Sequence, residues 1–492
     1  MIAIQAKKHD NFSVEFKFGF NCTIDGVADD FAVNAWIFVP NSLDITPENY
    51  GKDQFYRDIK SNVRLITPSF SLEELAKETS LPLMSLKSAL AGVVASPSDS
   101  SSIDTYEYHL KMFAAIYKSA LRNQAKALMN SVSLLEASEQ VDDYVVNSRK
   151  VLLLFRELYE QIKSEEVVDR VRTCFQMCNE FMAHVLEVRT LNLIKTIDAS
   201  HDSQACEAIR KKLTDLLLQE SAYRKQCGYA LISGNPKQDR RLVHHFSMLK
   251  KYIESELYIR LDKKKDGVAL QQIYYSLAAG FAMVFATAVS WYYQERYGSV
   301  TWPLFVVLVI SYMLKDRIKD LLRYYFAHKL GNKYYDKKAQ IAIGKTKVGA
   351  MKEGFDFISD TKLPKEVRSM RDNASFVEGE SSIFEEKIML YRQRIVLDDK
   401  ALVIDNQYRR EGVNEILRLH LYRFTHKMDN PLMSVDQMHE DGRVESLNVQ
   451  KVYYINVVFQ LVHDGAVQYK HFRIGMSRDG IFEVEPISPC SK

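Results

Sequence analysis

The fragment Gly-Lys-Thr at residues 344–346 is the best candidate for phosphate chemistry in this sequence. A glycine-rich loop that ends in these residues holds phosphate groups with backbone N–H groups and with its lysine. Such a loop also needs a glycine five positions earlier, where Ala339 stands, and a buried strand before it, where the polar run 332–340 stands. Asp405 ends an apolar segment that is typical of a magnesium-binding strand but equally of a β-hairpin arm. We therefore do not assign nucleotide hydrolysis to this fragment.

Histidine and cysteine residues show no spacing that indicates a metal centre or a redox pair. His244 and His245 are adjacent, so they point to different faces of a helix. Cys174 and Cys178 share one helix face, which is more typical of apolar packing than of redox chemistry. The remaining candidates lie on expected strands without a His-x-Glu or Cys-x-x-Cys partner: His420, His426, His463 and His471. Motifs such as Gly-x-Ser-x-Gly and His-Glu-x-x-His are also missing, so the sequence predicts no catalytic, cofactor-binding or metal-binding residue.

The composition excludes several classes of protein. The 492 residues are enough for two or three domains, and the formal net charge of +3 is too small for a chain dedicated to nucleic acid. The six cysteines have no paired spacing, which indicates free thiols in a reducing compartment. Residues 1–16 lack a continuous apolar segment, so a cleaved secretory signal is not expected. The hydrophobic share of 47% is that of an ordinary globular chain, so a membrane signal must come from local segments.

Two apolar segments are long enough to cross a bilayer. The 21 residues of 273–293 are almost wholly apolar and would form a helix of about 31 Å, close to a hydrocarbon thickness of about 30 Å. Residues 298–314 are 17 uncharged residues, the lower limit for a span, with Pro303 in the first helical turn. The predicted order is transmembrane helix 268–294, external turn 295–300 and transmembrane helix 301–314. The alternatives are a buried helix of a soluble core and a re-entrant second segment.

Flanking charges give the predicted orientation. Lysine and arginine residues are frequent before residue 266 and after residue 314, whereas the connecting turn has only Arg296. The positive-inside rule then places both termini in the cytoplasm and the turn outside, in a plasma or inner membrane. Aromatic residues at the turn are expected to form an interfacial belt: Trp291, Tyr292, Tyr293, Tyr297 and Trp302.

Small residues recur every four positions in the first span and form a packing ridge of Ala278, Ala282, Ala286 and Ser290. Such a ridge allows two helix backbones to approach closely, so we expect it to face the second span or a copy of itself. Neither span contains an ionisable residue, which is where ion paths and proton relays normally appear. A plain anchoring hairpin is therefore favoured over a pore or a transporter.

The segment after the second span is strongly basic. Between residues 315 and 352 there are eleven Lys or Arg residues and three Asp residues, a net charge of +8. We expect a basic juxtamembrane helix at 315–343 that contacts anionic lipid headgroups, although the same charges would also serve only to fix the topology. The expected contacts are Lys315, Arg317, Lys319, Arg323, Lys329, Lys333, Lys337 and Lys338.

The other regions are predicted to form mixed α and β structure on the cytoplasmic side of the membrane. Residues 1–95 open with a β-hairpin in which Val14, Phe16, Phe18 and Phe20 alternate with polar residues. The remaining predicted regions are a Ser-rich linker at 96–103, a helical bundle at 104–265, a connector at 344–380 and an antiparallel β-domain at 381–492, with turns at Asp464-Gly465 and Asp479-Gly480. The sequence leaves open whether the N-terminal hairpin joins the C-terminal sheet.

The predicted fold is thus an α+β membrane protein with a two-helix transmembrane hairpin between two cytoplasmic regions. The leading interpretation of its function is a non-enzymatic, membrane-anchored scaffold or signalling protein that binds protein partners or itself, with no nucleic acid expected. One alternative is a pore-forming or membrane-perturbing effector assembled through the Ala278 ridge. The other is a membrane-bound enzyme whose site no motif reveals.

Overall fold

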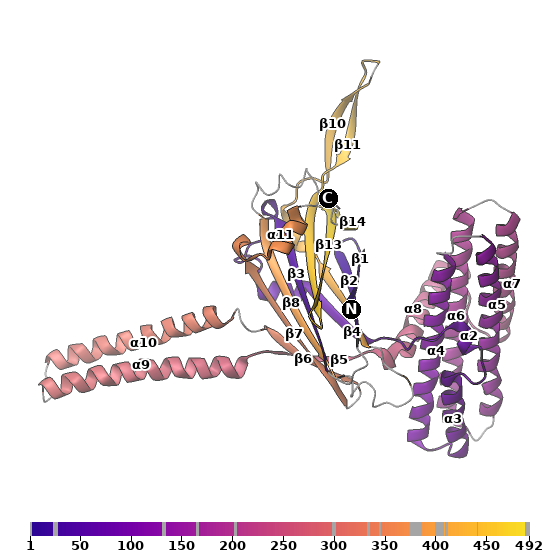
Figure 1. Cartoon of the computed structure of the whole chain (residues 1–492), viewed down its shortest axis with the longest axis horizontal. Coiled ribbons are helices and arrows are strands. Elements are labelled where there is room, and N and C mark those ends of the chain that lie inside the picture. The colour runs from indigo at the N-terminus through magenta and orange to yellow at the C-terminus, as the bar shows by residue number, and fades with distance from the viewer. Residues whose placement is uncertain are drawn as a thin grey trace. The chain divides into compact units, whose positions relative to one another are not determined.

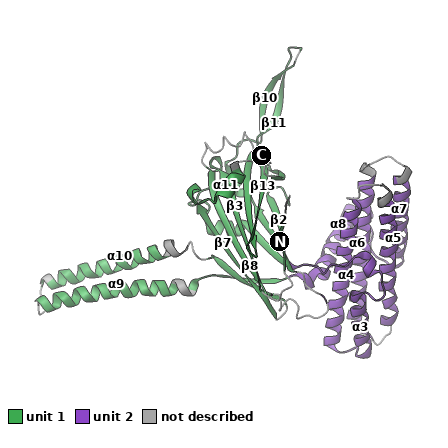
Figure 2. Cartoon of the chain, viewed as in Figure 1, with its two compact units in different colours: residues 1–63, 259–402, 412–492 green, residues 64–258, 403–411 purple. Residues whose placement is uncertain are grey.

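The computed structural model of the protein divides the chain into two compact units. Unit 1 consists of residues 1–63, 259–402 and 412–492, and unit 2 of residues 64–258 and 403–411 (Figure 2). The described residues are 2–22, 28–129, 134–163, 167–200, 204–297, 302–331, 335–343, 346–372, 386–398, 408, 412–439 and 441–487. Most of unit 2 is therefore one long insertion between segments that belong to unit 1.

Unit 2 is built from helices. They are α2 (Leu72–Leu75), α3 (Leu81–Ala95), α4 (Ser100–Met129), α5 (Leu134–Glu157), η2 (Leu158–Ile162), α6 (Asp169–Ser200), α7 (Gln204–Gln226), α8 (Pro236–Ile253) and η3 (Glu254–Leu257). α4 packs against α3, α5 and α6, and α6 also contacts α7 and α8. α2 begins at a capping box in which the Glu74 amide donates to Ser71 Oγ at 3.1 Å and the Ser71 amide to Glu74 Oε2 at 2.8 Å.

The start of the helical unit differs from the boundary that the sequence predicted. The Ser-rich stretch 96–103 was expected to be a linker, but α4 begins inside it at Ser100. Asp99 explains the start, because its Oδ2 accepts hydrogen bonds from the Ser102 amide at 3.0 Å and from Ser102 Oγ at 2.6 Å. α3, which lies before this stretch, packs on α4 and therefore belongs to the same unit.

The core of unit 2 is aromatic and contains two of the cysteines. Phe155 stacks between Phe113 and Phe175, with ring centroids 5.6 and 4.7 Å apart. Cys174 and Cys178 are buried free thiols on α6. Burial raises the pKa of Cys174 to about 11, which disfavours the reactive thiolate. These positions fit the packing role that the i, i+4 spacing indicated.

The body of unit 1 is built from a small four-stranded and a large eight-stranded β-sheet. The small sheet has the order β1 (Ile2–Lys8), β2 (Ser13–Asn21), β9 (Gly412–His420) and β4 (Ile59–Leu65). The large sheet has the order β14 (Gly480–Ile487), β13 (Ala466–Ser477), β12 (Tyr453–His463), β3 (Asp29–Pro40), β8 (Glu386–Leu397), β7 (Thr346–Ile358), β6 (Lys337–Ile343) and β5 (Arg260–Lys265). Short helices connect some of these strands: η1 (Asn41–Leu43), α1 (Lys52–Asp58), η4 (Asp360–Lys362) and η6 (Tyr422–Lys427).

N-terminal and C-terminal segments of the chain share both sheets. β2 pairs with β9, with Phe16 opposite Leu417, and β3 lies between β8 and β12, with Ala35 opposite both Tyr391 and Phe459. The N-terminal hairpin therefore joins the C-terminal strands, which answers the question that the sequence left open. Strand alternation specifies which face of a strand is apolar, but it does not specify the partner strand.

The two sheets pack face to face through a cluster of aromatic side chains, the aromatic end. Its members are Phe16, Phe18, Phe20, Phe31, Phe459 and Phe472. The Phe459 ring lies 4.9 Å from Phe16 and 5.6 Å from Phe18 in edge-to-face geometry, and Phe20 lies 5.3 Å from Phe31. The predicted alternation of β2 is confirmed, because its phenylalanines point into this interior.

The opposite face of the large sheet is covered in part by α11 (Lys365–Asp372), which contacts β12 and β13 (Figure 1). Val367 of this helix packs with Trp36, Phe38, Ile388 and Val458 in a second apolar cluster. A short amphipathic helix can therefore bury the part of this face that carries large apolar side chains.

Two long helices are inserted between β5 and β6, which are paired neighbours at the edge of the large sheet. α9 (Val268–Tyr297) and α10 (Trp302–Gly331) run side by side (Figure 1). Tyr274 of α9 stacks on Phe326 of α10 at 5.3 Å. α10 ends at Gly331 and β6 follows at Lys337, whereas the sequence predicted a helix as far as residue 343; the alternation of Ala339 and Ile341 with polar residues favours the strand.

Among the described residues, one helix has the length and hydropathy of a membrane span. It is Gln272–Arg296 of α9, with a mean hydropathy of 1.5 and only 11% of its most apolar window buried. α10 does not meet the same criterion, because its uncharged part is short and basic residues follow in the same helix. The expected pair of spans is therefore supported for one helix only.

A two-stranded hairpin, β10 (Leu432–Met438) and β11 (Val444–Gln450), also extends from unit 1 (Figure 1). Every described residue of both strands is exposed. One of its faces carries the apolar side chains of Met433, Val435, Leu447 and Val449.

Candidate functional site

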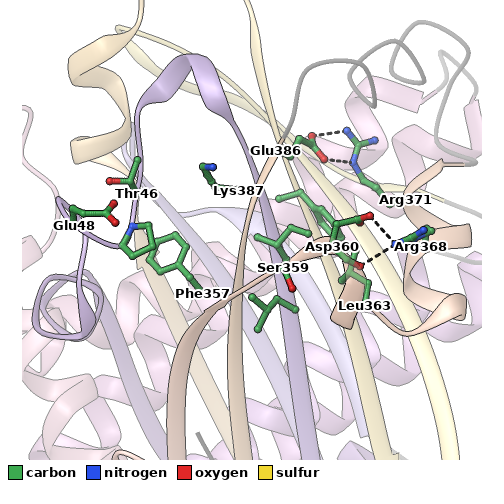
Figure 3. A pocket seen from close by; sticks show the side chains of 14 residues that line it. Thr46, Glu48, Phe357, Ser359, Asp360, Leu363, Arg368, Arg371, Glu386 and Lys387 are labelled. Carbon is green, nitrogen blue, oxygen red and sulfur yellow. Dashed lines mark hydrogen bonds and ion pairs between the residues drawn. The ribbon is translucent and has the colours of Figure 1, made fainter. Parts of the chain in front are cut away.

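A cavity of unit 1, the outer cavity, has a volume of about 860 Å³ and lies beside α11 (Figure 3). The ends of β3 and β7, the start of β8 and α11 contribute its walls. Its lining residues are Phe38, Thr46, Pro47, Glu48, Phe357, Ile358, Ser359, Asp360, Leu363, Arg368, Arg371, Glu386, Lys387 and Ile388.

Charged side chains surround the outer cavity, and both of its arginines are held by carboxylates. Arg371 donates from Nη2 to Glu386 Oε1 at 2.7 Å and from Nε to Glu386 Oε2 at 3.2 Å. Arg368 Nη2 donates to Asp360 Oδ2 at 2.7 Å (Figure 3). Three basic and three acidic residues line the cavity, so their formal charges cancel. These ion pairs fasten α11 to the strand ends, and they offer no excess charge for a ligand.

A second cavity, the polar cavity, lies between the two sheets of unit 1 and has a volume of about 290 Å³. Strands β4 and β9 of the small sheet line it, together with β5, β6, β7 and β8 of the large sheet. Its lining residues are Tyr56, Ile59, Lys60, Ser61, Asn62, Lys263, Lys337, Glu353, Tyr391 and Leu417.

A fully buried carboxyl group, Glu415, lies behind the wall of the polar cavity. Its Oε1 accepts hydrogen bonds from Ser61 Oγ at 2.5 Å and from Gln393 Nε2 at 2.7 Å. Glu415 Oε2 and Gln393 Oε1 have no hydrogen-bond partner among the described residues, although both atoms are buried. Burial raises the pKa of Glu415 to about 7, against the lowering effect of the two hydrogen bonds. This carboxyl group therefore changes its charge near neutral pH.

A second buried carboxylate, Glu353, lines the polar cavity itself and is paired. Lys263 Nζ lies 2.7 Å from Glu353 Oε1, and Glu353 is 3% exposed. Tyr391 is also buried, and burial together with the nearby Glu353 carboxylate raises the pKa of its phenol well above the usual range. The Tyr391 phenol therefore stays protonated at neutral pH.

The mouth of the polar cavity is basic. Lys337 Nζ lies 3.9 Å from the centroid of the Tyr56 ring, and burial lowers the pKa of this ammonium group. The Tyr56 hydroxyl donates to Asp336 Oδ2 at 3.0 Å, which holds the ring in place. Lys60 and Asn62 of β4 complete the mouth, and both are exposed. The cavity lining thus combines lysines with the buried Glu353 carboxylate, the buried Tyr391 phenol and the half-buried Ser61 hydroxyl.

A third cluster brings three potential metal ligands together. His463 Nε2 lies 3.0 Å from Asp29 Oδ1 and 3.3 Å from Asp464 Oδ2. The His463 ring also stacks on Phe31 at 4.3 Å. The sequence found no partner for this histidine, because Asp29 is 434 positions away. A hydrogen bond between the imidazole and the buried Asp29 carboxylate accounts for this arrangement without a metal ion.

The residues predicted for helix packing and for the interfacial belt lie on α9 and at the start of α10. Ala278 and Ala282 are buried in a helix whose packing partner is α10, and Ala286 and Ser290 are half-buried on the same face. In the predicted belt Trp291, Tyr292 and Trp302 are exposed, Tyr293 is half-buried, and the side chain of Tyr297 lies outside the described residues.

The basic residues predicted to contact lipid headgroups differ in their surroundings. Arg317 is exposed, Lys319 pairs with Asp316 and Lys338 with Asp266. Lys315 and Arg323 lie over the rings of Tyr312 and Tyr275. Only Lys337 joins a described cavity that contains other titratable groups. The side chain of Lys329, and Lys333 altogether, lie outside the described residues, as do Gly344 and Lys345 of the Gly-Lys-Thr fragment.

The polar cavity was not predicted from the sequence, although the pattern of polar residues in three strands indicates it. Glu353, Gln393 and Glu415 each occupy the inward phase of a strand whose other inward residues are apolar. On β7, β8 and β9 those neighbours are Met351, Phe355, Tyr391, Ile395, Val413 and Leu417. A polar residue in the buried phase of a strand indicates either a satisfied hydrogen-bond network or a site. Cross-strand pairing of Glu353 with Gln393 then brings two of the three together.

Comparison of the chain with models of known protein families, with curated proteins and with solved structures gives no match.

Proposed function

We propose that the protein is a membrane-anchored interaction protein, in which α9 and α10 hold units 1 and 2 at the cytoplasmic face of a bilayer. The observation that carries this proposal is the surface of α9. Over Gln272–Arg296 the helix has a mean hydropathy of 1.5. Only 11% of its most apolar 18-residue stretch is nevertheless buried against the rest of the protein. A soluble protein rarely leaves so long an apolar helix exposed to water, because each Å² of apolar surface costs about 25 cal/mol there.

The features of α10 support its role as a second, shorter span. Its first turns carry exposed apolar side chains such as Phe305 and Val309, and they contain no charged residue before Lys315. The Lys315 ammonium lies 3.7 Å from the centroid of the Tyr312 ring, on a stem that can extend to the headgroup level. Trp291 and Trp302 are exposed at the shared end of the two helices, as an outer interfacial belt requires.

The proposed topology places both termini in the cytoplasm. Lys263, Lys264 and Lys265 precede α9 on β5, and Lys337 and Lys338 follow α10 on β6. The positive-inside rule favours this side of the membrane for both strands. Since β5 and β6 are paired with each other, one sheet edge holds both helices, which suits an anchor for the cytoplasmic units.

A pore assembled from several copies of the chain is disfavoured. In that alternative the small-residue ridge of α9 joins copies of the chain. Ala278 and Ala282 are 0% and 1% exposed, so the ridge is already used in contact with α10. A membrane-bound enzyme remains the other alternative, and turnover that survives Lys345→Ala would exclude its Gly-Lys-Thr form.

The anchor is tested by charge insertion. Phe281 and Val284 are 61% and 66% exposed near the centre of α9, and Phe281→Arg with Val284→Arg adds about 6 kcal/mol to the free energy of insertion. We expect the wild-type chain to stay in the membrane pellet after alkaline extraction and the double variant to be released. The matched control is Ile232→Arg with Val243→Arg, two exposed apolar residues of unit 2. Release of the wild-type chain, or retention of the variant, would contradict the anchor.

The interaction role needs a separate experiment. Affinity capture of the full chain from native membranes, followed by identification of co-purified proteins and a cross-linking assay of self-association, measures it directly. We expect a partner or a second copy that is retained through the cytoplasmic units. Recovery of the chain alone and monomeric would contradict the interaction role, whereas it would leave the anchor intact.

A further inference from the structure

We infer that the β10–β11 hairpin of unit 1 is a self-association surface, on which a second copy of this chain packs its own hairpin face to face and reversed end to end. The inference rests on the interaction role proposed above, which it deepens by naming the partner and the surface. Every residue that it uses belongs to unit 1 and is described.

The hairpin has little support within one copy of the chain. Among the described strands, β10 and β11 pair only with each other, and every residue of both strands is exposed. A lone two-stranded hairpin is marginally stable in water, whereas packing of an apolar face against another element stabilises it. The extended hairpin (Figure 1) is therefore expected to gain stability from a partner on one of its faces.

The two faces of the hairpin differ. In the middle of one face Ser446 Oγ donates to Asp436 Oδ1 at 2.6 Å, and Ser434 lies opposite Asn448. This polar face can stay in water, and the apolar residues on it lie only at its two ends: Leu432, Met438 and Val444. The middle of the other face, the apolar face, consists of two cross-strand pairs whose members are between 41% and 58% exposed: Met433 with Val449, and Val435 with Leu447.

Opposite charges flank the apolar face along one strand. Glu445 precedes Leu447 near the turn, and Lys451 follows Val449 at the base of the hairpin. The Lys451 amide donates to the Pro431 carbonyl at 2.8 Å, which continues the pairing of the two strands by one residue and keeps Lys451 in phase with Val449. At about 3.3 Å per residue, the two charges lie roughly 20 Å apart, at equal distances from the middle of the apolar face.

A second copy matches this pattern when its hairpin lies over the apolar face in the reversed direction. In this two-fold arrangement Glu445 of each copy faces Lys451 of the other, and Val449 of each copy faces Leu447 of the other. Packed sheets lie about 10 Å apart, a gap that a lysine and a glutamate side chain can span together. A copy laid in the same direction brings Glu445 over the uncharged Gln437 instead, so the charges favour the reversed one.

The flanking charges are accessible although each has a partner within its own copy. Lys451 pairs with Asp429, and Glu445 Oε2 lies 2.9 Å from His439 Nε2. These four side chains are between 42% and 64% exposed, and ion pairs at such exposed sites contribute little to stability. Each charge can therefore also face an opposite charge of a second copy.

The size of the apolar face indicates a weak dimer. Four partly exposed side chains per copy make a smaller contact than the about 800 Å² per partner of a standard interface. We therefore expect a dissociation constant on the order of micromolar, so association is measured over a range of protein concentrations.

The charge pattern is tested by reversing its signs in the full chain. Light scattering in detergent micelles measures the protein mass of the particles as the concentration rises. Glu445→Lys and Lys451→Glu each place like charges face to face at both ends of the dimer, so each variant alone should dimerise at least about tenfold more weakly than the wild-type chain. An equimolar mixture of the two variants regains both opposite-charge contacts and should dimerise like the wild-type chain. A monomeric wild-type chain, or a mixture no better than the single variants, would overturn the inference.

The apolar contact is tested at two neighbouring residues of β11. Val449→Asp puts a charge on the apolar face and should abolish dimerisation. Asn448→Asp, the matched control, puts the same charge on the polar face of the same strand and should leave the dimer unchanged. A dimer that survives Val449→Asp, or one that both variants weaken equally, would overturn the assigned face.

The outcome is distinguishable from failure of the proposed function. A chain that captures another protein from membranes but stays monomeric by itself would overturn this inference and leave the interaction role intact. A chain that proves soluble is measured without detergent, so the result does not depend on the membrane anchor. The mixture of charge-reversed variants remains decisive even if Val449→Asp unfolds the hairpin.

Discussion

The two ends of the interior of unit 1 differ in chemistry although the same two sheets enclose both. At the aromatic end, phenylalanines from β2, β3, β12 and β13 fill the space between the sheets. At the polar end, Glu353, Gln393 and Glu415 occupy equivalent inward positions of β7, β8 and β9, and a cavity remains. Buried aromatic rings stabilise a fold, whereas buried carboxyl groups cost free energy unless they are paired. The aromatic end is therefore expected to contribute more to the stability of unit 1 than the polar end.

The aromatic end should carry the largest effect on stability. Phe459 is 1% exposed and contacts both Phe16 and Phe472, so Phe459→Ala should lower the free energy of unfolding of unit 1 by about 3–5 kcal/mol. Urea unfolding of the full chain, followed by near-ultraviolet circular dichroism, measures this change. Val467→Ala, at a residue of β13 that is 51% exposed, is the control and should change little. A loss below about 1 kcal/mol for Phe459→Ala would remove the contrast between the two ends.

The polar end should make stability depend on pH. The pKa of Glu415 rises from 4.5 in the unfolded chain to about 7 in the folded one, so the folded state binds more protons between these values. The protonated Glu415 carboxyl therefore makes its full contribution to the free energy of unfolding below pH 4.5. This contribution is lost as the pH rises through about 7. The change is about 3.5 kcal/mol at most, since one pKa unit corresponds to about 1.4 kcal/mol.

Glu415→Gln is the matched variant for this pH dependence. The amide keeps an oxygen that can accept from Ser61 and Gln393, but it does not titrate in this range. Urea midpoints measured across the window from pH 4.5 to about 7 should fall for the wild-type chain and stay more nearly level for the variant. Parallel curves for the two chains would show that Glu415 does not set the pH response.

Removal of one hydrogen bond at the polar end should have a smaller effect. Ser61→Ala deletes the 2.5 Å hydrogen bond to Glu415 Oε1, which should lower the free energy of unfolding by about 1–2 kcal/mol above pH 7. Because this hydrogen bond lowers the pKa of Glu415, the pH midpoint of the stability change should move upward in the variant. Ser446→Ala is the control, since Ser446 donates to the exposed Asp436 at 2.6 Å. An unshifted midpoint would argue against the Ser61 contact.

The smallest effect is expected outside both ends. Lys338 is more than half exposed and lies 3.6 Å from Asp266, so Lys338→Ala should change stability by less than about 0.5 kcal/mol. The same urea series measures it. A larger loss would mean that the rim of the sandwich, as well as its aromatic end, contributes to stability.

Local features of the fold could be predicted from the sequence because they depend on neighbouring residues. The inward alternation of β2 and the turn at Asp464-Gly465 both appear as expected, the turn with φ values of 49° and 76°. The exposed apolar helix α9 was visible as a long uncharged segment for the same reason.

The assembly of the sheets could not be predicted in this way. β3 pairs with β8 and β12, which lie more than 340 residues further along the chain, and alternation alone is compatible with many partners. The helical boundary near residue 64 was also missed, because α2 and α3 are assigned to unit 2 by their packing on α4 and α5, and their local pattern does not show it.

The sequence by itself determined features with a local cause: the tight turn at Asp464-Gly465, the inward face of β2 and the long apolar helix α9. Only the tertiary structure decided that Ser61, Gln393 and Glu415 meet in one buried hydrogen-bonded group, although the first and the last are 354 positions apart in the chain. The physical reason is that the charge of a buried carboxyl group depends on its burial and on the dipoles around it in space. Strands distant in the chain supply those dipoles, so pairing register, and not composition, creates the candidate site.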